Sequence, residues 1–307
     1  MRRLLPLLAP FLLLASCARP TTGPDAPIAL EQVTPAPALA GGAARQTVIE
    51  FVEAYAGASS DGGAALGELV TGDELESWVD WLAVQNAQFP GRVEALPDVR
   101  SVAFVGATRT ERALGAQVNL GASIRFSYAP AQGEPFDRTR FLDGTVTLVS
   151  LAPGDWRVLD LTRDGVPMSD GIKLFEDEVR TEGGVMVRLD SLFMFTPNWQ
   201  FNVVVENRTG GEIRLDPEGT ALFLRTGVGE FERIDGVISP SLAALPVGTG
   251  VQSLLSFPLQ DSAEGRVLLL TFRRGDEVYR LDFPLEDLVT TVPPPPPTDG
   301  TEEPVLV

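Results

Sequence analysis

The sequence predicts two folded regions: an α+β region with helices on one face of an antiparallel sheet, then an all-β sandwich. Early in the chain, apolar residues recur at spacings of three and four, as on one face of a helix. Further on, short runs of β-forming residues alternate with turn residues. About 245 residues lie between the two tails, which suits two domains of ~100–200 residues each.

The first helix is expected over residues 43–58, where Val48, Phe51, Val52 and Tyr55 form one apolar stripe. A second helix is expected to run to Phe89-Pro90, because the same spacing returns at positions 75, 78, 79 and 82. The preceding sequence, Thr71-Gly-Asp-Glu74, predicts side-chain capping of its first turn.

Three tryptophans lie in this first region, at positions 78, 81 and 156. Trp78 belongs to the apolar stripe of the second helix, and core packing is the favoured interpretation for all three. For Trp81, a pocket wall and an exposed anchor stay open as alternatives.

After Pro97 the pattern changes to strands. Four runs rich in β-forming residues, separated by turn residues, predict a four-stranded meander: residues 99–108, 116–128, 140–151 and 156–164. Helices followed by such a meander favour an α+β domain over residues 43–166.

The end of this meander carries a resemblance. Residues 145–151, the turn Pro153-Gly-Asp155 and residues 156–165 together resemble the closing hairpin of NTF2-like domains of bacterial envelope proteins. The resemblance implies a curved sheet wrapped around helices, forming a cone that often encloses a pocket. Because the family includes isomerases, dehydratases and non-catalytic modules, the fold alone does not decide the function.

Four residues are candidate liners of that pocket: Tyr55, Asp80, Asn119 and Asp160. A carboxylate facing a tyrosine could perform proton transfer. The alternative is structural, with Asp80 as a helix-surface charge and Asp160 as a strand-end charge. No catalytic residue is assigned.

Residues 167–184 are polar and irregular and are expected to be a connector. From 185 to 289, seven β-rich runs with intervening turns predict an immunoglobulin-like β-sandwich. Residues 203–209, 213–217 and 222–224, with the step Leu245-Pro-Val-Gly248, resemble the immunoglobulin-like domain of bacterial surface lipoproteins. That family implies contacts with other envelope modules and no general activity. Asn207-Arg-Thr209 fits a glycosylation sequon, interpreted as a coincidence in a bacterial protein.

The N-terminus carries a targeting signal. Arg2 and Arg3 precede a short leucine-rich run, which describes a signal peptide over residues 1–16. Leu14-Ala15-Ser16-Cys17 resembles the lipobox of bacterial lipoproteins, which implies cleavage between Ser16 and Cys17 and a diacylglyceryl thioether on Cys17. Ala18 then implies delivery to the outer membrane of a two-membrane cell, or to the outer face of the plasma membrane in a single-membrane cell.

Both tails are expected to be extended. Residues 17–42, rich in proline, alanine and threonine, predict a disordered tether behind the lipid. Residues 290–307 predict a proline-rich, acidic, disordered tail.

Composition excludes several classes of function. A net charge of −18 disfavours nucleic acid as a partner. The sequence has no histidine and one cysteine, which removes histidine-dependent catalytic sites and thiolate metal sites. No cofactor and no metal are expected.

The sequence therefore predicts a non-enzymatic protein that is lipid-anchored in the cell envelope and binds or scaffolds another envelope protein. A carrier of a small hydrophobic ligand, using a pocket in the first domain, is the alternative. A proton-transfer enzyme is the third reading.

Overall fold

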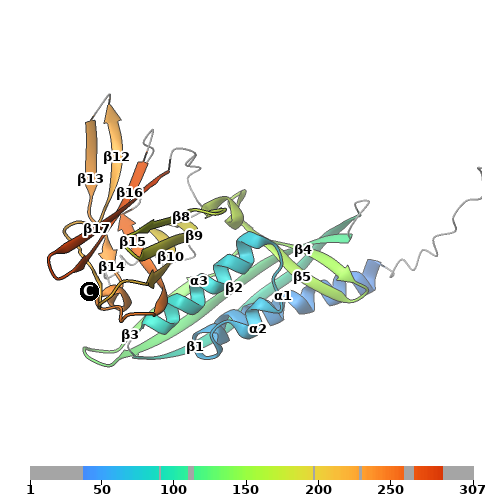
Figure 1. The fold of residues 1–307 in the computed structure, drawn as a ribbon. Coiled ribbons are helices and arrows are strands. Elements are labelled where there is room, and N and C mark those ends of the chain that lie inside the picture. Colours follow the sequence, from blue (N-terminus) through green and yellow to red (C-terminus); the bar gives the residue numbers. More distant parts are fainter. Residues whose placement is uncertain are drawn as a thin grey trace, which may run out of the picture. The chain divides into compact units, whose positions relative to one another are not determined.

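The structure is a computed structural model that describes residues 37–89, 91–109, 114–195, 198–227, 230–258 and 266–285. The predicted signal peptide, the cleavage position after Ser16, Cys17 and the tail over residues 290–307 lie outside these ranges. Strands make up 58% and helices 21% of the structure, in three sheets and three helices among the described residues. The molecule is therefore predominantly β (Figure 1).

Three helices open the described chain: α1 (Pro37–Asp61), α2 (Ala64–Gly67) and α3 (Asp73–Gln88). The first begins inside the segment expected to be tether. The predicted capping of α3 by Thr71 is wrong, because the N-cap is Gly72 and no side chain caps it. Thr71 instead donates its backbone N–H to the carbonyl of Val158 (2.9 Å), since the chain before α3 bridges to a strand of the first sheet.

The first sheet has the strand order β1-β2-β4-β5-β6, with β3 also paired to β2. Its strands are β1 (Gly91–Arg109), β2 (Leu114–Pro130), β3 (Phe136–Phe141), β4 (Gly144–Ala152), β5 (Asp155–Arg163) and β6 (Val166–Pro167). β1 and β2 form one long antiparallel hairpin, paired from Gly91↔Pro130 to Arg109↔Leu114. β1 thus starts before Pro97, which an edge strand tolerates.

The second sheet has the order β14-β15-β10-β9-β7, with β8 paired to β9. Its strands are β7 (Ile172–Leu174), β8 (Val179–Glu182), β9 (Val185–Phe195), β10 (Asn198–Asn207), β14 (Val237–Ile238) and β15 (Gly250–Pro258). Residues 167–184, which were expected to be an irregular connector, therefore contain β7 and β8. Ile172 of β7 is buried in the first of the two cores described below.

The third sheet has the order β11-β16-β12-β13, with β17 paired to β16. Its strands are β11 (Arg214–Leu215), β12 (Ala221–Gly227), β13 (Glu230–Ile234), β16 (Arg266–Arg274) and β17 (Glu277–Pro284). Two short 3₁₀ helices, η1 (Met168–Gly171) and η2 (Pro240–Leu242), complete the elements.

The second and third sheets form a sandwich around one of two cores. Trp199, Phe201 and Phe257 come from the second sheet, and Phe272 and Phe283 come from the third. All five are fully buried, and Phe201 and Phe257 meet edge to face with ring centroids 5.8 Å apart. Along β10, Phe201, Val203 and Val205 are all directed into this core.

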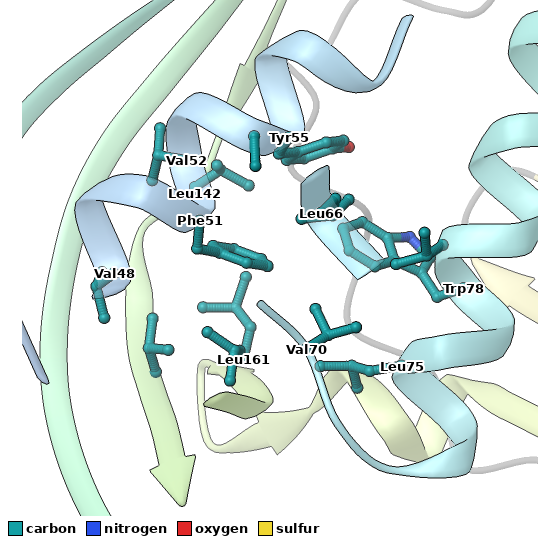
Figure 2. Packing of buried hydrophobic residues seen from close by; sticks show 14 of the residues in the cluster. Val48, Phe51, Val52, Tyr55, Leu66, Val70, Leu75, Trp78, Leu142 and Leu161 are labelled. Carbon is teal, nitrogen blue, oxygen red and sulfur yellow. The ribbon is translucent and has the colours of Figure 1, made fainter. Parts of the chain in front are cut away.

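The other core lies between the helices and the first sheet. Figure 2 shows Val48, Phe51 and Tyr55 of α1 directed toward the same interior as Leu75 and Trp78 of α3. The Tyr55 and Trp78 rings meet edge to face at 5.1 Å.

Helix α3 also contacts the second sheet, through Trp81. The Trp81 ring lies 5.2 Å from that of Phe193 on β9, and its Nε1 donates to Oε1 of Gln200 on β10 (2.7 Å). Phe193 and Leu254 of the second sheet belong to the first core, and all described residues lie in one compact unit.

The expected fold class, an NTF2-like cone of helices on a curved sheet joined to an immunoglobulin-like sandwich, is wrong. The structure is a mostly β, sandwich-like fold of three sheets. Two physical features account for the difference. The meander begins with a hairpin of long strands, and α3 is shared between two sheets, so it does not close a cone over one of them.

Candidate protein-binding groove

The space between the helices and the first sheet, where a pocket was expected, is filled with side chains. Figure 2 shows Phe51, Leu66, Val70 and Leu161 packed into it. Each of these is buried, as are the two tryptophans of α3. These side chains belong to one hydrophobic cluster shared by the helices and the first sheet.

Tyr55 is one of the four predicted pocket residues, and its ring is part of this core. Its hydroxyl accepts a hydrogen bond from Nη1 of Arg140 on β3 (2.6 Å). The guanidinium of Arg140 also lies over the Phe126 ring, 5.4 Å from its centroid. The hydroxyl of Tyr55 thus faces a cation and an aromatic ring.

Asp160 supports the chain that follows β5. Its Oδ1 accepts the backbone N–H groups of Met168 (3.0 Å) and Ser169 (3.3 Å), and its Oδ2 accepts the Ser169 hydroxyl (2.5 Å). A carboxylate that caps the first turn of η1 in this way acts on the backbone of that turn. The side chain is a structural anchor that lies within β5 and holds the turn that follows it.

Asp80 and Asn119 are both exposed. Asn119 lies on β2 and accepts a hydrogen bond from the Thr145 hydroxyl (2.9 Å). Asp80 lies on α3; although the residue is exposed, desolvation of its carboxylate by neighbouring groups and the nearby charge of Asp190 raise its pKa above the ordinary 3.8. The four predicted residues therefore occupy four different environments, and the proton-transfer arrangement that was considered is not assembled.

A groove of about 560 Å³ opens on the surface between α1 and β1. Its helix wall includes Glu53, Ala56, Gly57 and Ser60, which recur at helical spacing and form one stripe. Three of these residues are small, which leaves the groove wide. A Cβ atom added at Gly57 would meet nothing within 4 Å.

The strand wall of the groove is the start of β1, from Arg92 to Ala95, together with Pro97. Val93 and Ala95 pack against the core on the same side of the strand. β1 ends the strand order of its sheet, so no described strand pairs with its other edge. The groove thus runs beside an unpaired row of backbone N–H and C=O groups.

The rest of β1 carries features that discourage pairing. Pro97 has no N–H to donate. Register shifts occur between Val99 and Ser101 and between Phe104 and Gly106, which are β-bulges. The uninterrupted edge is therefore the segment Gly91–Leu96, next to the groove.

The charge of the groove is mainly negative. Glu53 is exposed and makes no ion pair within the described part of the chain. Glu94 pairs with Arg92 (2.5 Å). The wall includes Ser59 and Ser60, at the C-terminal end of α1, and no basic residue lies in the last turn of that helix.

The groove was missed in the sequence because β1 was expected to begin after Pro97. The alternation of Val93 and Ala95 with the charged residues Arg92 and Glu94 is the signal that could have revealed it. Among the described residues, no three or more acidic, histidine or cysteine side chains gather in a way that could hold a metal ion. The helices that the structure describes include none with the length and apolar character of a membrane span.

Comparison of the chain with protein-family models finds no match, and comparison with curated protein sequences finds no significant match.

Proposed function

We propose that this chain is a lipid-anchored, non-enzymatic protein of the bacterial cell envelope that binds another envelope protein. The observation that carries the proposal is the groove beside the unpaired edge of β1. An accessible strand edge next to a groove is a common way for a protein to take up an extended segment of a partner. The lipobox resemblance at residues 14–17 supports the anchored location.

The packed interior favours this function over the alternatives. A carrier of a hydrophobic ligand needs an enclosed apolar cavity, and core side chains occupy the expected place. A proton-transfer enzyme needs a carboxylate next to the tyrosine, whereas Tyr55 faces Arg140 and Asp160 caps η1.

Metabolic labelling tests the anchor. Radiolabelled palmitate should enter the wild-type protein and should be absent from a Cys17→Ser variant, which should leave the membrane fraction. A mature Cys17→Ser protein that stays membrane-bound would overturn the anchored location.

Native mass spectrometry of the full lipidated chain, extracted from its own membrane in detergent, tests partner binding. We expect a defined complex with a second envelope protein. A stoichiometric small molecule in place of a protein would overturn the binding function and favour a carrier.

A further inference from the structure

β1 ends the strand order of the first sheet, and the groove is lined by the same strand, so one more strand could pair with β1 beside the groove. A strand added to β1 would lie about 4.8 Å from it, beneath the end of α1. Val93 and Ala95 form its floor, and the stripe of Glu53, Ala56, Gly57 and Ser60 forms its wall. Strand and helix together therefore frame an extended chain on two sides.

The N-terminal part of β1 suits such pairing better than the rest of the strand. Residues 91–96 precede Pro97 and both bulges, so their backbone runs without a break in register against β2. After Leu96, Pro97 lacks a backbone N–H and the two bulges twist the strand. Both features commonly protect a free strand edge from pairing with other chains. Residues 91–96 are therefore available for pairing with another strand, whereas the rest of the β1 edge is protected from it.

We infer that an extended segment of another protein, bearing lysine or arginine, adds as a strand to residues 91–96 of β1 and fills this groove. This inference rests on the proposed function and names the class of partner that the site would take.

Charge identifies the occupant as basic. Glu53 projects from the wall without an ion-pair partner among the described residues. The C-terminal end of a helix carries a partial negative charge, and α1 ends at this wall with no basic residue in its last turn. A lysine or arginine side chain beside Ser59 and Ser60 would pair with the Glu53 carboxylate and interact favourably with the negative end of α1.

The same charges argue against a second copy of the chain as the occupant. Pairing of β1 with β1 of a second copy would bring Glu53 and Glu94 of each close together, within chains that each carry a net charge of −18. The partner is therefore a different protein.

Peptide binding to the full chain in detergent tests the inference. The probe is a fluorescent peptide of about eight residues that alternates lysine and valine, a length that covers the open window. Its counterpart alternates glutamate and valine. We expect the lysine peptide to bind and the glutamate peptide to bind at least about tenfold more weakly.

Two matched glycine variants on α1 locate the site. Gly57→Leu fills the groove, whereas Gly42→Leu places the same side chain elsewhere on the same helix. An added Cβ meets nothing within 4 Å at either position, so both variants should fold. The Gly57→Leu change should raise the Kd of the lysine peptide at least about tenfold, and Gly42→Leu should leave it unchanged. Glu53→Lys should weaken binding about fivefold.

Hydrogen exchange identifies the pairing. Binding of the lysine peptide should slow exchange of edge amides within residues 91–96, because a new strand would protect them. Equal affinity of Gly57→Leu and Gly42→Leu, equal affinity for both peptides, or protection only elsewhere would overturn the inference.

Native mass spectrometry of Gly57→Leu separates this inference from the proposed function. A partner protein retained equally by wild type and Gly57→Leu would uphold the function and overturn the groove as its site. Peptide binding as expected here, with a small molecule in place of a partner in the native complex, would uphold the groove and overturn the function.

Discussion

Asn207, at the end of β10, is fully buried and fixes two loops at once. Its Nδ2 donates to the carbonyls of Gly211 (2.9 Å) and Leu245 (2.8 Å). Its Oδ1 accepts the backbone N–H and the hydroxyl of Thr209 (3.0 and 2.8 Å). The amide of this sequon is therefore committed to the fold, which supports the interpretation of the glycosylation pattern as a coincidence.

Replacing Asn207 should destabilise the folded protein. We expect Asn207→Ala to lower the free energy of unfolding by about 1–3 kcal/mol, because it leaves the buried N–H of Thr209 without its acceptor. Asn119→Ala is the matched control on an exposed strand position and should change it by less than about 0.5 kcal/mol. Urea titration measures both, and equal costs would contradict the role of Asn207.

The titration of Asp80 should make the free energy of unfolding depend on pH. Desolvation of the Asp80 carboxylate and the charge of Asp190 raise its pKa in the folded state. In the window above the ordinary value of 3.8, the folded protein then binds more protons than the unfolded chain. The stability that Asp80 contributes is therefore fully present below pH 3.8, and it is lost as the pH rises through the folded-state pKa.

Asp80→Asn should remove this penalty. The variant should be more stable than wild type at pH 7, and the difference should shrink as the pH falls toward 3.8, where Asp80 of the wild type is protonated. Urea titrations at several pH values measure this, with Glu134→Gln in an exposed turn as control. A gain that grows at low pH would contradict the assignment.

Helix α3 joins α1 to the second sheet within the first core, because its two tryptophans contact different elements. Trp78 packs with Phe51 and Tyr55 of the first core. Trp81, only 7% exposed, packs on Phe193 and bonds to Gln200, whose Nε2 in turn donates to the Ser256 hydroxyl (3.1 Å).

Trp81→Ala should destabilise the protein by about 3–4 kcal/mol, as large-to-small changes at buried aromatic residues do. Hydrogen exchange should accelerate on β9 and β10, which lose the cover of the helix. Trp81→Phe keeps an aromatic ring against Phe193 and should cost clearly less. A loss confined to the amides of the first sheet would contradict the bridging role.

Elements were easier to predict from the sequence than their roles. The stripe of Val48, Phe51 and Tyr55 reveals a helix because its signal is local. Trp81 is different, since its partner Gln200 lies 119 residues further along the chain. Asp160 is similar, because nothing in its own strand shows that the later turn at Met168 needs a cap.

At the scale of the whole molecule, the sequence did not predict how the strands assemble into sheets. The seven β-rich runs after residue 184 all became strands, since β-forming residues bounded by turn residues are a local signal. The proline at position 97 hid the start of β1, and with it the long hairpin and the groove. The shared helix and three-sheet arrangement depend on packing between distant segments, which periodicity cannot report.

Because the second sheet contributes Phe193 and Leu254 to the first core and Leu192 and Leu255 to the second, the described unit should unfold as one. Calorimetry of the wild-type protein should show a single transition, and Trp81→Ala should split it into two as the cores become independent. Trp78→Ala, which loosens the first core without touching the second sheet, is the control. Two transitions in the wild type would contradict the coupling.

The contact of Trp81 with Phe193 and Gln200 also constrains how this chain can change over generations. A smaller residue at position 81 leaves a hole that only a larger neighbour at position 193 can refill, so the two positions should vary together among descendants. Position 78 should instead vary with Phe51 and Tyr55. Exchange of either half of the gene for a foreign module would mismatch this contact, so the halves should be inherited together.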